Sequence, residues 1–120
     1  MQTPSDIVVI PRDLHFRTES ASGTAWLGGD PVATAVFNAL SLTFPDGERL
    51  FIDSVRAFRS RLQGKLAEDA RAFIAQEAIH SREHACLNAQ LDRSHYPVAR
   101  IEDSVRRRLA FLRKLGPMRM

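Results

Sequence analysis

The sequence predicts an all-α protein, a helical bundle preceded by an extended N-terminal arm. Apolar residues recur at intervals of three and four over most of residues 30–116, which is the period of a helix with one buried face. Proline and glycine gather before residue 30 and at the breaks between these stretches. One stretch also carries a glutamate and two histidines at helical spacing. With 120 residues and 44% hydrophobic content, the chain is long enough for one domain with its own core.

The predicted arm comprises residues 1–29. It contains one short run of β-type residues, at positions 7–10, and several of the residues that interrupt regular structure. We therefore expect an extended segment that wraps over the helical body. The interrupting residues are Pro4, Pro11, Gly23, Gly28 and Gly29.

Two helices are expected next, over residues 31–44 and 47–62. Asp30 supplies an N-cap acceptor, and Pro31 occupies the first helical position, where its missing N–H costs nothing. Pro45 should end or kink the first helix, because proline removes a hydrogen bond from a helix interior. The Pro-Asp-Gly sequence that begins there predicts a turn between the two helices.

A third helix is expected over residues 65–91 and a last one over residues 99–115. A Gln-Gly pair precedes the third helix, and a polar loop separates it from the last. Gly116 and Pro117 end the last helix. The sequence thus predicts a helical domain over residues 30–116, followed by a tail at residues 117–120.

Charge and composition exclude several classes of protein. The cationic residues that produce the net charge of +3 crowd the last fifth of the chain, where they alternate with apolar residues at helical spacing. This pattern favours a solvated helix face over a nucleic-acid partner. No run approaches the ~20 apolar residues of a membrane span, and no secretion signal is visible. We expect a cytoplasmic protein without membrane contact, and the single Cys86 excludes an internal disulfide.

Glu77, His80 and His84 share one face of the predicted helix 65–91, within a stripe that is apolar at both ends. Burying three ionisable side chains without partners is costly. A divalent metal ion (iron, zinc or manganese) resolves the conflict, and Glu-x-x-His is the spacing used by di-metal carboxylate bundles. The three side chains can share one ion, or His84 can serve a second ion or support the first ligands. The alternative is that they are packed or surface residues.

Two further residues are candidates for the same site. Glu48 lies on the apolar face of the predicted helix 47–62, which favours a metal ligand, although a glutamate in a first helical turn also has a purely structural use. Gln76 adjoins the Glu77 stripe, and we expect it to hydrogen-bond a ligand carboxylate, since metal ligands normally need such support.

Three blocks of the sequence, in this order, resemble a known family. They are WLGGDPVAT at residues 26–34, FPDGERLF at residues 44–51, and FIAQEAIH at residues 73–80, followed by His84. The family consists of bacterial proteins described as predicted metal-dependent hydrolases, a ferritin-like helical group. The resemblance covers roughly residues 13–112 and implies a dinuclear metal site in a helical bundle, with Glu48, Glu77 and His80 among its ligands. It also implies that His84 belongs to the family motif, as a ligand or as support for one.

The resemblance also implies that members continue into further helices, which bring a second set of ligands. This sequence looks like the N-terminal half of such a protein, half of a ferritin-like di-metal bundle. A four-helix di-metal site uses about four carboxylates and two histidines. Either two copies complete the site across a two-fold axis, or the chain carries a partial site. The sequence favours a homodimer.

The primary functional expectation is a metal-dependent hydrolase acting on an unidentified small molecule. Water activated by the cation would be the nucleophile, and His84 is the candidate catalytic residue that moves protons. The first alternative is a di-iron oxidoreductase of ferritin-like type, since Glu-x-x-His bundles often hold two irons. The second is a truncated, non-catalytic domain for metal binding or oligomerisation. No phosphate-binding glycine loop, nucleophile elbow or dinucleotide fingerprint is present.

Overall fold

The computed structural model describes residues 7–21 and 23–115, and all regular structure within them is helical. The predicted all-α class is therefore confirmed. The expected tail at 117–120 and the first six residues of the arm lie outside the described residues. The elements are the short 3-10 helix η1 (Thr18–Ala21), α1 (Pro31–Phe58), the 3-10 turn η2 (Arg59–Arg61), α2 (Gly64–Ala89) and α3 (Val98–Leu115).

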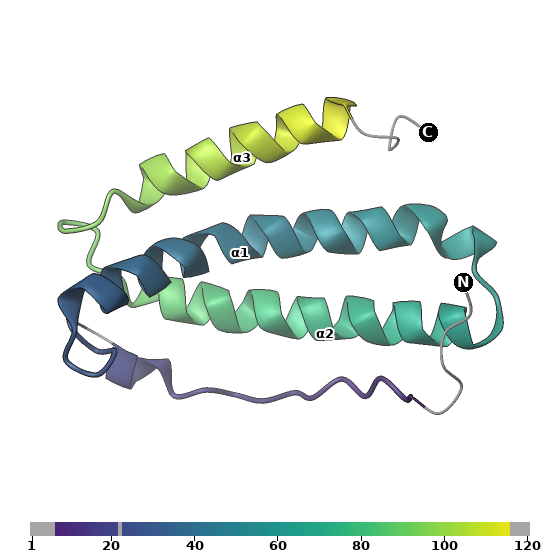
Figure 1. Cartoon of the computed structure of the whole chain (residues 1–120), viewed down its shortest axis with the longest axis horizontal. Helices are drawn as coiled ribbons and strands as arrows, with labels where there is room; N and C mark the ends of the chain where they lie inside the picture. Colours follow the sequence, from purple (N-terminus) through teal and green to yellow (C-terminus); the bar gives the residue numbers. More distant parts are fainter. Residues whose placement is uncertain (1–6, 22, 116–120) are drawn as a thin grey trace.

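The helices lie side by side with α1 in the middle (Figure 1). Helix α2 packs on one side of α1 and α3 on the other, while the N-terminal arm runs along α2 on the side away from α1. The molecule is accordingly thin, with principal extents of 47 × 34 × 19 Å. None of the helices in the described part of the chain combines the length and the apolar character that a membrane crossing requires.

The separate helices predicted for residues 31–44 and 47–62 are wrong, because α1 runs without a break through Pro45. Its start is as predicted: Asp30 Oδ1 accepts hydrogen bonds from the backbone N–H groups of Val32 and Ala33, at 2.8 and 3.1 Å. The expected turn at Pro-Asp-Gly is absent, and these residues are helical. Glu48 therefore lies in the helix interior, and a first-turn role for it is excluded.

The continuity of α1 has a specific cause in α2. A proline at position 45 has no N–H to give to the carbonyl of Ser41, four residues earlier, so that carbonyl loses its helical partner. Asn88 of α2 replaces it: Asn88 Nδ2 donates to Ser41 O at 3.1 Å. Because the orphaned carbonyl is satisfied from the neighbouring helix, the helix continues past the proline.

A small apolar cluster joins the three helices at one end of the molecule. Leu42 of α1, Leu91 and Val98 are almost fully buried, and Tyr96 and Ile101 pack against them. The loop after α2 thereby fixes where α3 begins. Two ion pairs link α3 to α1 farther along, Arg106 to Asp46 at 3.4 Å and Arg113 to Asp53 at 2.6 Å.

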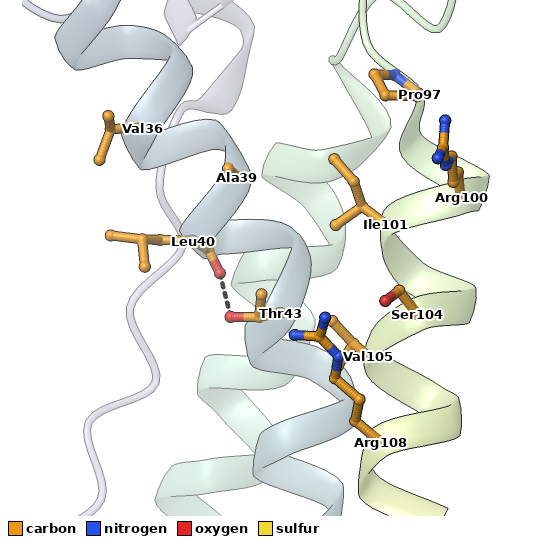
Figure 2. A pocket seen from close by; sticks show the side chains of 10 residues that line it. All are labelled: Val36, Ala39, Leu40, Thr43, Pro97, Arg100, Ile101, Ser104, Val105 and Arg108. Carbon is orange, nitrogen blue, oxygen red and sulfur yellow. Dashed lines mark hydrogen bonds between the residues drawn. The ribbon is translucent and has the colours of Figure 1, made fainter.

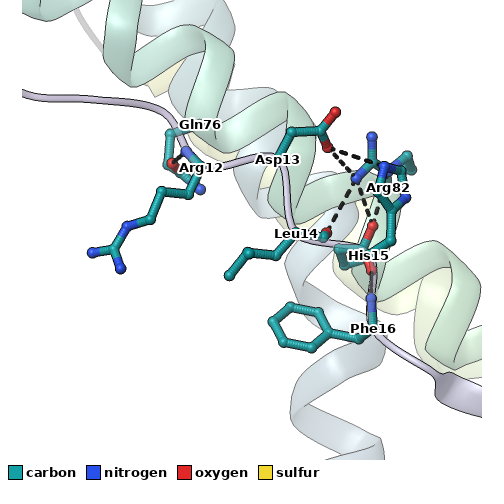
Figure 3. Close-up of polar contacts among 8 residues, drawn as sticks. Arg12, Asp13, Leu14, His15, Phe16, Gln76 and Arg82 are labelled. Carbon is teal, nitrogen blue, oxygen red and sulfur yellow. Dashed lines mark hydrogen bonds and ion pairs between the residues drawn. The ribbon is translucent and has the colours of Figure 1, made fainter.

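The arm is held to α2 by hydrogen bonds with side chains of that helix (Figure 3). An extended segment makes no helical hydrogen bonds of its own, so its backbone groups need other partners. The N–H of Arg12 donates to Gln76 Oε1 at 2.9 Å, and the N–H of Phe16 donates to Glu83 Oε2 at 3.0 Å. Arg82 binds Asp13 Oδ1 at 2.6 Å, which completes a clamp on residues 12–16.

Candidate metal centre

Glu48, Glu77 and His80 converge between α1 and α2. One ligand-type atom from each lies within 4.8 Å of the others. Helix α1 supplies Glu48, and α2 supplies the other two from adjacent turns of one face, because residues three apart lie above one another. The structure thus brings together three of the four residues predicted as metal ligands, although Glu48 lies 29 positions before Glu77 in the sequence.

The group is closed on one side and open on the other. Glu48 is only 5% exposed, Glu77 is half-buried, and the side chain of His80 is 56% exposed. His80 Nδ1 lies 3.9 Å from Glu48 Oε1, which is beyond hydrogen-bond distance. A small ion or molecule could therefore reach the buried carboxylate past the exposed imidazole.

The chemistry of these residues fits a divalent cation. Glu48 Oε2 is buried and has no hydrogen-bond partner among the described residues, which is rare and costly for a carboxylate oxygen. Burial raises the pKa of Glu48, and the nearby Glu77 carboxylate raises it further, against smaller opposing effects of His80 and Ser81. A cation would offset both penalties. Two carboxylates and an imidazole form an oxygen and nitrogen ligand set suited to zinc, iron or manganese.

His84, the fourth nominated residue, lies beside this group rather than within it. Its Nε2 is 3.9 Å from Glu48 Oε1, and its ring lies 4.5 Å from that of Phe44, measured between centroids. Burial lowers the pKa of His84, and the proximity of His80 lowers it further. A lowered pKa favours the neutral imidazole, the form that can accept a proton or bind a metal.

The tautomer of His84 follows from a chain of hydrogen bonds. The Ser41 carbonyl only accepts, so the Asn88 amide must turn its Nδ2 toward it and its Oδ1 toward the Ser41 hydroxyl. Ser41 Oγ therefore donates its one hydrogen to Asn88 Oδ1, at 2.7 Å. Its remaining contact, 2.9 Å to His84 Nδ1, must then be accepted from an Nδ1–H group. The lone pair of neutral His84 consequently lies on Nε2, the atom that faces Glu48.

Ser41 and Asn88 were not predicted as residues of the site. Both are buried, at 3% and 6% exposed, and their hydrogen bonds position His84. A signal for each was present: Asn88 follows His84 by one helical turn, and Ser41 is the residue whose carbonyl Pro45 leaves without a partner.

The structure places Gln76 outside the group of ligand-type residues. Its Oε1 accepts a hydrogen bond from the backbone of Arg12, so this oxygen anchors the arm. Glu83, on the same side of α2, does likewise through Phe16. The arm therefore packs against residues one turn or less from Glu77 and His84, which makes it part of the wall around the candidate site.

Comparison with known proteins adds an independent finding. Residues 10–120 match the model of a family described as predicted metal-dependent hydrolases. No curated protein matches the chain, and neither does any solved structure.

Proposed function

Since this chain belongs to the family of predicted metal-dependent hydrolases, we propose that Glu48, Glu77 and His80 hold a divalent metal ion that serves hydrolysis of a small molecule. The observation that carries the proposal is the buried Oε2 of Glu48, which has no hydrogen-bond partner in the described part of the chain and lies next to two further ligand-type side chains. A structural carboxylate at this depth would be expected to have hydrogen-bond partners for both oxygens.

Each residue of the site has a separate role in the proposal. When bound, a divalent cation supplies a lowered pKa for water and polarisation of a carbonyl or phosphoryl oxygen. Glu48 and Glu77 supply negative charge from two helices, and His80 completes the set from the open side. His84 Nε2 carries a lone pair close to Glu48, so this atom can take a proton from the attacking water, while Nδ1–H stays bonded to Ser41.

The metal part of the proposal is tested by measuring metal content of the purified protein after loading with zinc, manganese or anaerobic ferrous iron. Glu77→Gln and His80→Ala should abolish binding and the rise in melting temperature that binding produces. The matched controls are Glu68→Gln, an exposed glutamate of the same helix, and His95→Ala, an exposed loop histidine. Equal metal content in all four variants would overturn the proposal.

The catalytic part is tested with chromogenic esters and phosphoesters, assayed with and without the loaded metal. Hydrolysis should require the metal and should fall in His84→Gln with the metal still bound. Binding of iron with a dioxygen-dependent near-ultraviolet absorbance, and no hydrolysis, would replace hydrolase by the di-iron oxidoreductase alternative. Metal binding without either activity would leave a metal-binding domain.

A further inference from the structure

Four phenylalanines follow one another along α1 at intervals of seven residues. They are Phe37, Phe44, Phe51 and Phe58, and they are 53%, 41%, 54% and 38% exposed. A seven-residue interval keeps side chains on one helix face, as in coiled coils. We call these residues the phenylalanine stripe. Soluble proteins rarely leave such a continuous apolar surface without a partner.

The phenylalanine stripe adjoins the metal centre. Phe44 precedes Glu48 by four residues and Phe51 follows it by three, so both lie one turn from Glu48. The ring of Phe44 also contacts that of His84. The phenylalanine stripe therefore borders the candidate metal centre at Glu48 and His84.

The exposed apolar surface of α1 also includes two aliphatic residues beside the stripe. Val36 and Leu40 are 51% and 46% exposed, and their side chains point away from α3 at the edge of the groove between α1 and α3 (Figure 2). Among the described residues, this exposed apolar face belongs mainly to α1.

The stripe has the symmetry of a contact between identical helices. Its midpoint lies between Gly47 and Glu48, so two antiparallel copies of α1 would place Phe44 opposite Phe51 and Phe37 opposite Phe58. A side chain at Gly47 would meet open space in the single chain. Gly47 therefore leaves room at the centre for the two backbones to approach closely.

The candidate metal ligands also point to a second copy of this chain as the partner. One chain provides a lone glutamate from α1 and a Glu-x-x-His pair from α2. Di-metal four-helix sites use two lone glutamates and two such pairs. Two copies of Glu48, Glu77 and His80 supply this complement, whereas one chain supplies half of it.

We propose that the phenylalanine stripe is the contact between two copies of this chain, packed antiparallel about Gly47. The copies form a four-helix bundle of two α1 and two α2 helices, in which the two half-sites face each other and share a dinuclear centre. The shared centre depends on the proposed metal-binding function, whereas the contact itself stands on the phenylalanine stripe and its symmetry.

Native mass of the full chain tests the contact. Light scattering after size-exclusion chromatography should give about twice the chain mass of 13.5 kDa. Phe51→Glu and Phe37→Glu should each give a monomer with unchanged helical circular dichroism. Phe111→Glu, which alters an apolar α3 residue that is 60% exposed, should remain dimeric. A monomeric parent protein, or dimers that survive both stripe substitutions, would overturn the contact.

A cross-link tests the arrangement. In a Cys86→Ser background, Gly47→Cys should form a covalent dimer on mild oxidation, because position 47 lies at the two-fold axis. The control is Ala57→Cys, an exposed position ten residues from the proposed axis and about 100° around α1 from Phe58. Equal cross-linking of the two variants would overturn the antiparallel pairing about Gly47.

Metal content separates the two proposals. A dimer with one metal per chain, and less metal in the Phe51→Glu monomer, supports the shared centre. A dimer that binds no metal rejects the proposed function and leaves the contact intact. A monomer that binds metal through Glu77 and His80 rejects the shared centre and leaves the proposed function intact. If only a different protein covers the phenylalanine stripe, the proposed contact between two copies of this chain is rejected.

Discussion

The two contacts of α1 differ in kind. Toward α2, helix α1 presents two buried polar side chains, Ser41 and Glu48, which meet the buried Asn88 of α2, and each of the three is at most 6% exposed. Toward α3 it is joined by the apolar cluster at one end and by exposed ion pairs along the rest, such as Arg113 with Asp53, whose side chains are 43% and 42% exposed.

This difference shows which of the two contacts fixes how the helices pack against each other. Buried hydrogen bonds are directional and costly to leave unmade, so the α1–α2 contact tolerates few alternative arrangements. Exposed ion pairs are screened by water and salt and contribute little. The candidate metal centre lies in the first contact, between α1 and α2.

Asn88→Ala should cause the largest loss of stability. It leaves the Ser41 carbonyl and the Ser41 hydroxyl without their partners in a buried place, so the free energy of unfolding should fall by about 2–4 kcal/mol. Urea denaturation measures the change. Ser104→Ala, a half-buried serine on α3, is the matched control and should cost less than about 1 kcal/mol. Equal losses in the two variants would contradict the difference between the contacts.

Ser41→Ala should lower stability by about 1–2 kcal/mol and change the tautomer of His84. The parent protein should show a proton on His84 Nδ1, because Ser41 Oγ accepts from it. Long-range proton–nitrogen spectra of the metal-free protein report the tautomer directly. In Ser41→Ala the proton should shift toward Nε2. A parent spectrum with the proton already on Nε2 would refute the hydrogen-bond chain.

Pro45→Ala should make Asn88 less important. The alanine N–H can bond to the Ser41 carbonyl within α1, so that carbonyl no longer depends on α2. In a double-mutant cycle, Asn88→Ala should cost about 1 kcal/mol less in the Pro45→Ala background than in the parent. Strict additivity of the two changes would show that Asn88 does not compensate for the proline.

Arg113→Ala should have a small effect, a loss of about 0.2–1 kcal/mol, because the ion pair with Asp53 is exposed. The loss should shrink further when the salt concentration is raised to 1 M. Thermal unfolding at two salt concentrations measures it. A loss of stability as large as that of Asn88→Ala would show that the α1–α3 contact constrains the helices as strongly as the α1–α2 contact.

Acid should release the arm without unfolding the helices. The pKa of Glu83 is lowered chiefly by the hydrogen bond from the Phe16 N–H, and the pKa of Asp13 chiefly by that from Arg82. Carboxylates with lowered pKa values favour the docked state fully above their ordinary values of 4.5 and 3.8, and this contribution is lost as the pH falls through the lowered values. Hydrogen exchange of the Arg12 and Phe16 amides should accelerate over that range, while amides within α1 keep their protection.

The features that could be predicted correctly are those that depend on residues close together along the chain. Apolar spacing gave the helical class, Asp30 and Pro31 gave the start of α1, and the Glu77 and His80 spacing placed both on one face of α2. Each of these follows from residues within a few positions of one another, where helical geometry is fixed.

Features that depend on residues far apart along the chain became visible only in the folded protein. Pro45 does not break α1 because Asn88 satisfies the carbonyl of Ser41, a residue 47 positions away from Asn88. The same contact sets the tautomer of His84, and the packing of α1 on α2 buries Glu48. Local propensity cannot predict such outcomes, because a backbone group can be satisfied by any suitable hydrogen-bond partner. The partner that it has is known only from the folded chain.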